Sequence, residues 1–174
     1  MLEILKNRRS VRQFIDKKIE DEKIKILKKS LLLSPTSRNL EPCEFIMVRN
    51  KETLKKLSKA KPHGATFLEN CDTAFVICGD IDKSDVCVED CSIASIILQL
   101  TAESLELGSC WAQVRLRRHN ENTLSEQYVK DTVNLPESFT VISIIGIGYP
   151  EKKPEPKPDE SLKTEKIHIE KYNG

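Results

Sequence analysis

The stretch from Thr140 to Gly148 constrains the fold of this chain more than any other. It reads TVISIIGIG and is almost continuously apolar. A strand with one face in water alternates apolar and polar residues, whereas a near-continuous apolar run predicts a strand that is buried on both faces. We therefore expect this stretch to be the central strand of a sheet.

Apolar spacing elsewhere predicts that helices and strands alternate along the chain. Further strands are expected at 45–48 and 74–78, and helices just before Arg8 and at 21–33, 52–60, 88–107 and 122–131. The helix at 88–107 is apolar around so much of its circumference that we expect it at the centre of the domain or in a dimer face. Residues 109–115, which follow it, are expected to form a tight connection.

The residues after the central strand have a different composition. From Tyr149 to Pro158 prolines alternate with charges, which predicts an extended arm rather than packed structure. Farther on, Ile167-His168-Ile169 alternates like a strand but has no neighbour in the sequence to pair with. We expect it to join the sheet edge of a partner subunit. The chain thus divides into a domain at 1–150 and an arm with its strand at 151–174.

The overall charge excludes some classes of partner. The chain has 28 Lys and Arg residues against 27 Asp and Glu, so nothing in its net charge favours a nucleic acid or an anionic membrane. No apolar run approaches the roughly 18 residues that span a bilayer, and the first residues lack the apolar core of a signal peptide. We expect a cytoplasmic protein of one domain.

The six cysteines are expected to be reduced thiols, because no export signal accompanies them. Cys87 and Cys91 are four residues apart and would share a helix face, but no second Cys or His pair at zinc spacing accompanies them. We therefore expect no metal site. A redox role for these two thiols remains an alternative.

The most distinctive polar motif is Arg8-Arg9-Ser10-Val11-Arg12. Its guanidinium groups are planar donors that suit a phosphate, although a basic run of this kind is also compatible with a solvated surface. Neither a dinucleotide-binding glycine motif nor a P-loop occurs. The histidines, which are far apart in the sequence, make a hydrolytic triad a poor interpretation.

Three motifs occur in a characteristic order. Arg8-Arg9-Ser10-Val11-Arg12-x-Phe14 is followed by the loop Ser34-Pro35-Thr36-Ser37-Arg38-Asn39-Leu40-Glu41-Pro42, and Ile147-Gly148-Tyr149-Pro150 precedes the Pro/Lys tail. In order, spacing and intervening pattern, the chain resembles the FMN-dependent nitroreductase family over nearly its whole length.

The resemblance implies an α+β fold, a three-layer sandwich in which helices flank a mainly antiparallel sheet. It also implies a homodimer that exchanges C-terminal segments and holds FMN at its interface. One subunit would contribute Arg8, Ser10, Arg12 and the backbone around Arg9, and Lys157 matches a basic phosphate-contacting position in the tail. The other would contribute Pro35, Thr36, Ser37 and Asn39. The segment Ala112-Gln113-Val114 corresponds to the turn whose backbone N–H faces the flavin N5 atom.

The activity implied by the resemblance is ping-pong reduction of nitroaromatic, quinone or related acceptors, with NAD(P)H as the reductant. The flavin does the chemistry, and no side-chain acid or base is needed. We expect Arg12 to stabilise the charge of the reduced ring. Glu41, Cys43, Val114 and Asp159 depart from residues common in the family. The departures at Glu41 and Asp159 leave open a flavin store or sensor without turnover.

Overall fold

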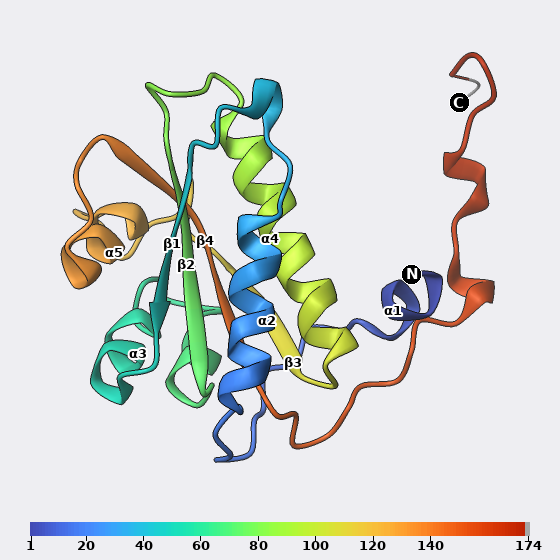
Figure 1. The fold of residues 1–174 in the computed structure, drawn as a ribbon, viewed down its shortest axis with the longest axis horizontal. Coiled ribbons are helices and arrows are strands. Elements are labelled where there is room, and N and C mark those ends of the chain that lie inside the picture. The colour runs from blue at the N-terminus through green and yellow to red at the C-terminus, as the bar shows by residue number, and fades with distance from the viewer. Residues whose placement is uncertain (173–174) are drawn as a thin grey trace.

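A four-stranded antiparallel sheet forms the middle of the molecule (Figure 1). The computed structural model describes residues 1–172. The strands are β1 (Cys43–Val48), β2 (Thr73–Asp80), β3 (Gly108–Gln113) and β4 (Phe139–Gly148), in the order β1-β2-β4-β3. Since β4 is an interior strand and is buried from Val141 onward, the prediction of a central strand is confirmed.

Helices cover both faces of this sheet, which gives the three layers seen in Figure 1. One face carries α2 (Asp21–Leu32) and α4 (Cys87–Ser104), and the other carries α3 (Lys51–Leu57) and α5 (Ser125–Val133). A short helix, α1 (Leu2–Asn7), lies beside α4. The predicted α+β sandwich is confirmed.

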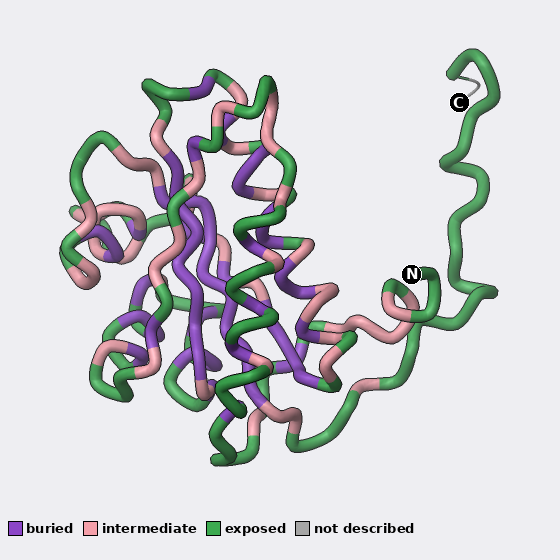
Figure 2. Tube along the Cα trace, in the orientation of Figure 1, coloured by how far each residue is buried: buried purple, intermediate pink, exposed green. Residues whose placement is uncertain are grey.

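The interior strands contribute to two separate cores. In β2, Val76 packs with Leu54 in the α3 and α5 layer. The residue before it, Phe75, points to the opposite face and packs with Leu27 in the α2 and α4 layer. Successive side chains of a strand point to opposite faces, so both positions must be apolar. This arrangement explains why the interior strands read as continuous apolar runs, and it appears as the buried centre of Figure 2.

The predicted tight connection at 109–115 is wrong, because most of it forms β3. This strand pairs with β4 from Gly108↔Gly148 to Gln113↔Ser143. Few of its residues favour a strand by themselves, and the buried neighbour β4 determines its conformation.

The long helix is not covered on all sides within one chain. Ile93 and Ile96 on α4 are 39% and 37% exposed, while Ala94 and Leu98 are fully buried against the sheet. Packing of this exposed apolar side against a second copy stays a prediction.

The C-terminal tail runs beside α1 and then extends away from the domain (Figure 1). The Lys157 N–H donates to the Lys6 carbonyl at 3.0 Å. Farther on, Ile167 and Ile169 are 78% and 81% exposed and belong to no strand within the described chain. Their pairing with a second copy remains a prediction. In residues 1–172 no helix has both the length and the apolar character needed to cross a membrane.

Candidate functional site

The segment that carries the arginine cluster is attached to the edge of the sheet. Ser10 forms a parallel bridge with Ser109 of β3, and the Val11 N–H donates to the Ser109 carbonyl at 3.0 Å. Val11 is buried, whereas Ser10 and Arg12 are exposed. Because side chains alternate in extended backbone, Ser10 and Arg12 both point away from the side on which Val11 is buried.

Two glycines allow this close attachment. A Cβ atom on Gly108 would lie 2.8 Å from the Val11 Cβ, and one on Gly148 would lie 2.9 Å from the Phe14 Cδ1. Real Cβ atoms do not approach other carbons so closely, so both positions exclude any larger residue without a shift. The glycines therefore fix where Ser10 and Arg12 stand relative to β3.

The guanidinium groups of the cluster have no internal counter-charge. Within residues 1–172, Arg8, Arg9 and Arg12 form no salt bridge with a carboxylate. Arg8 ends α1, where its N–H donates to the Ile4 carbonyl at 2.8 Å. Cations that are held in place without an acidic partner are suited to an external anion.

A further cation, Lys61, acts on the same thiol as Arg12, that of Cys110. Burial raises the pKa of the Cys110 thiol, and the charges of Arg12 and Lys61 act against that rise. Burial, and then the charge of Arg117, lowers the pKa of Lys61 itself. Positive charge from two distant parts of the sequence is therefore concentrated around Cys110.

No sequence pattern marks Lys61 as a site residue. It lies in a polar connection after α3, among other lysines, and no motif or spacing distinguishes it from Lys55, Lys56 or Lys59. Only the fold brings it close to Cys110.

The backbone of β3 decides which N–H group can face a ligand. The Val114 N–H donates to the Ile142 carbonyl of β4 at 3.1 Å, so it is already used within the sheet. In an antiparallel pair, N–H groups point alternately toward and away from the neighbouring strand. Of the predicted segment, Ala112 and Val114 therefore face β4, and Gln113 presents its N–H to the open side. The Trp111 indole N–H donates to the Gln113 side-chain Oε1 at 2.9 Å and holds that side chain in place.

The loop with the other predicted residues lies at the opposite end of α4. The Ser37 N–H donates to Asp90 Oδ1 near the start of that helix at 2.9 Å, and the Thr36 hydroxyl accepts from the Glu41 N–H at 3.0 Å. A helix rises about 1.5 Å per residue, so roughly 20 Å separates Asp90 from Ser104, the last residue of α4. One chain thus does not bring Pro35, Thr36, Ser37 and Asn39 to the arginine cluster.

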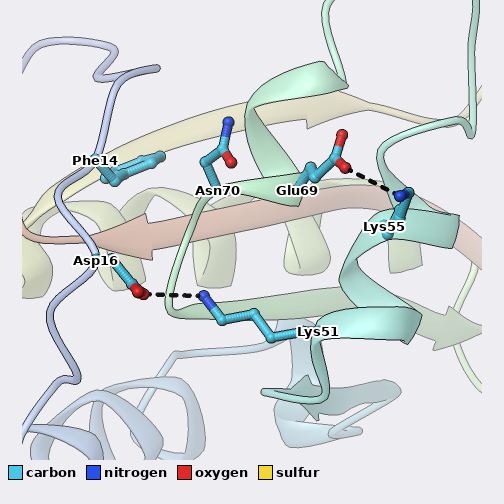
Figure 3. Close-up of a pocket in the computed structure, with 6 residues that line it drawn as sticks. All are labelled: Phe14, Asp16, Lys51, Lys55, Glu69 and Asn70. Atoms are coloured by element: carbon cyan, nitrogen blue, oxygen red, sulfur yellow. Dashed lines mark hydrogen bonds and ion pairs between the residues drawn. The ribbon is translucent and has the colours of Figure 1, made fainter.

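A hollow near Phe14 does not match an anion site (Figure 3). It measures about 420 Å³ and is lined by Phe14, Asn70 and four charged residues. Lys51 pairs with Asp16 at 3.4 Å, and Lys55 pairs with Glu69 at 3.7 Å. The charges that line the hollow compensate one another. The arginine cluster, which has no acidic partner, is therefore the stronger anion site.

Known proteins resemble this chain over its full length. The sequence profile of the Nitroreductase family matches residues 5–69. A protein of Archaeoglobus fulgidus with the provisional name NADH dehydrogenase/NAD(P)H nitroreductase is 35% identical, and the match covers 98% of each chain. The structure of an FMN-dependent nitroreductase from Clostridium difficile R20291 is 39% identical with a TM-score of 0.97, covering 99% of this chain and 100% of its own.

The chain belongs to the nitroreductase family. A solved structure from Parabacteroides distasonis, whose provisional name is also NADH dehydrogenase/NAD(P)H nitroreductase, supports the same placement. It is 34% identical with a TM-score of 0.89, and the match covers 98% of each chain. The family predicted from the sequence is therefore confirmed, and the chain is an oxidoreductase.

Two residues that depart from the common nitroreductase pattern have local contacts. Glu41 has a left-handed backbone (φ 49°) and closes the loop through its N–H bond to Thr36. Asp159 pairs with Lys6 at 3.0 Å, so its charge is directed to α1. Lys157, two residues earlier, lies beside the same helix, at the end of the molecule that holds Arg8.

Proposed function

We propose that this protein is an NAD(P)H-dependent FMN oxidoreductase. The observation that supports this most directly is the attachment of the Ser10–Arg12 segment to the edge of β3, where Arg12 has no acidic partner and acts with Lys61 on the Cys110 thiol. The arrangement offers a hydroxyl, two cationic groups and the outward N–H of Gln113 along one edge of the sheet.

The donor set fits the chemistry of FMN. Arg8 and Arg9, with Lys157 at the same end of the molecule, would hold the phosphate, since guanidinium groups bind phosphate with paired hydrogen bonds. Ser10 would hold the ribityl chain. Arg12 and Lys61 would lie at the pyrimidine edge of the ring, where their charge stabilises the negative charge of the reduced state.

We propose that the site is completed by a second copy of the chain. In one copy, the loop with Pro35, Thr36, Ser37 and Asn39 lies far from the arginine cluster, at the other end of α4. Two copies packed through the exposed side of α4, around Ile93 and Ile96, would place the loop of one near the cluster of the other.

The open edge of the sheet supports the same dimer. The outer edge of β3 is covered at Ser109 by the Ser10 segment, whereas β1 pairs only with β2 among the described strands. Unpaired strand edges accept a further strand. The exposed Ile167–Ile169 segment of a partner is the occupant we propose for the β1 edge.

When bound, FMN would supply a ring that takes a hydride from NAD(P)H and passes electrons to an acceptor. We propose ping-pong exchange, in which NAD(P)H and then a nitroaromatic, a quinone or a related small acceptor uses the same face of the ring. The contribution of the chain is to hold the ring, to place positive charge at one edge and to leave one face accessible.

Anaerobic stopped-flow mixing tests this function. The FMN-loaded protein is mixed with NADH and, separately, with NADPH, and flavin absorbance is followed. We expect rapid bleaching with at least one of them, and recovery when a quinone is added. A flavin that stays oxidised with both reductants would instead indicate a flavin store or sensor.

A further inference from the structure

Three thiols that play no part in the proposed flavin site meet at the start of α4. Cys43 is the first residue of β1, and Cys87 and Cys91 lie in the first turns of α4. The Cys43 and Cys91 Sγ atoms are 3.4 Å apart. We call these three residues the thiol cluster.

A glycine beneath the thiol cluster allows it to pack closely on the sheet. A Cβ atom on Gly79 of β2 would lie 2.3 Å from the Cys87 Sγ and 2.8 Å from the Cys91 Sγ. No side chain can occupy that space while the thiols remain there.

Geometry selects Cys43 and Cys91 as the pair able to form a bond. Residues four apart on a helix have Cβ atoms about 5–6 Å apart, whereas a disulfide needs about 3.5–4.5 Å. A Cys87–Cys91 bond would therefore distort α4. Cys43 approaches Cys91 from a different element, and its sulfur already lies at contact distance.

Exposure and hydrogen bonding give the two thiols different roles. Cys43 is partly exposed, whereas Cys91 is fully buried. A hydrogen bond from the Cys91 thiol lowers the pKa of Cys43, against the opposing effects of burial, Asp90 and Glu44. The same bond and burial raise the pKa of Cys91. The accessible sulfur is thus the better nucleophile, and the buried one keeps its proton.

We propose that Cys43 and Cys91 form a peroxide-reactive dithiol site, in which Cys43 attacks the peroxide and Cys91 resolves the product as a disulfide. In the first step, the Cys43 thiolate attacks one oxygen of hydrogen peroxide. A sulfur–oxygen bond forms, the oxygen–oxygen bond breaks, and hydroxide leaves and takes a proton from water or buffer. Cys43 is oxidised to a sulfenic acid, and the peroxide is reduced.

In the second step, the Cys91 sulfur attacks the Cys43 sulfur. The sulfur–sulfur bond forms, the sulfur–oxygen bond breaks, and the leaving hydroxide takes the Cys91 proton as water. In sum, two thiols and one hydrogen peroxide give one disulfide and two waters. The sulfur atoms must close from 3.4 Å to about 2.05 Å, a movement of side chains at the first residue of β1.

Peroxide treatment of the full-length, FMN-loaded protein, followed by thiol counting and disulfide mapping, tests the proposal. We expect two of the six free thiols to be lost and to return with dithiothreitol. Digestion with trypsin and a glutamate-specific protease separates the peptides, because Glu89 lies between Cys87 and Cys91. The expected product joins the peptides of Cys43 and Cys91.

Matched variants separate the roles of the three thiols. Cys87→Ala should form the same disulfide as the wild type, whereas Cys91→Ala should leave a Cys43 sulfenic acid that dimedone traps. The mapping on wild-type protein decides the question even if a variant fails to fold. Six remaining thiols at a peroxide concentration that oxidises free N-acetylcysteine, or a disulfide between Cys87 and Cys91, would overturn the proposal.

Discussion

Replacing Gly108 with alanine should displace the arginine segment from the sheet. The new Cβ would lie 2.8 Å from the Val11 Cβ and Cγ1 atoms and 2.9 Å from its Cγ2. Carbon atoms in ordinary contact are about 3.5–4.0 Å apart, so Val11 must retreat by roughly 1 Å. That retreat takes the bond from the Val11 N–H to the Ser109 carbonyl, now 3.0 Å, beyond normal hydrogen-bond range.

The expected effect on stability and binding follows from these contacts. A lost backbone hydrogen bond costs about 1 kcal/mol and overpacking about 1–3 kcal/mol, so the free energy of unfolding should fall by about 2–4 kcal/mol. Ser10 and Arg12 move with Val11. The loss of one charge-assisted hydrogen bond should raise the Kd for FMN about 10- to 100-fold.

The matched control is Gly146→Ala on β4. Its Cβ would lie 2.8 Å from Phe67 and 2.9 Å from Leu68, in the core layer of α3 and α5. Thermal unfolding should show a similar loss of stability in both variants, while FMN fluorescence titration shows weaker binding only for Gly108→Ala. Wild-type FMN affinity in a destabilised Gly108→Ala protein would refute the role given to the position of this segment.

Arg12→Gln and Lys61→Gln should each raise the Kd for FMN about 10-fold and weaken its dependence on salt, while Lys59→Gln leaves both unchanged in the same titration. Equal effects of Lys59→Gln would show that only general charge matters. A chain that stops before Lys152 should lose both its dimer and its flavin, as measured by light scattering and absorbance; retention of both would count against the exchanged tail. Because the hydrogen bond from Cys91 lowers the pKa of Cys43, its alkylation by iodoacetamide should begin at a lower pH than that of free cysteine, and before that of the other five thiols. Mass spectrometry of timed samples checks this order, and simultaneous labelling would contradict it.

Sequence periodicity identified the elements whose own apolar residues are buried in the core. The run ending at Gly148 had to be an interior strand, because both of its faces are apolar. β3 was missed because its residues have weak strand preference and are held by pairing with β4. Pairing partners that are distant in the sequence leave no local signal.

In the candidate site, too, local motifs could be predicted from the sequence, whereas contacts between distant residues could not. The motif from Arg8 to Arg12 could be recognised as a set of phosphate donors, but its anchoring on Ser109 depends on a contact across about a hundred residues. Lys61 joins the set only through the fold. Likewise, the Val114 N–H of the predicted Ala112-Gln113-Val114 segment is used inside the sheet, and the alternation of strand backbone shows this only once the pairing is known.

In the proposed dimer each flavin site is shared between two copies, one contributing Arg12 and the other the loop with Asn39. Mixing two variants that bind FMN weakly, Arg12→Glu and Asn39→Glu, at an FMN concentration near the wild-type Kd tests this sharing. If sites are shared, a hybrid dimer has one site with both changes and one intact site. After equal mixing and subunit exchange, we expect about a quarter of wild-type FMN binding to return. If FMN binding stays at the level of the separate variants although hybrid dimers form, each site lies within one chain, which contradicts a shared site.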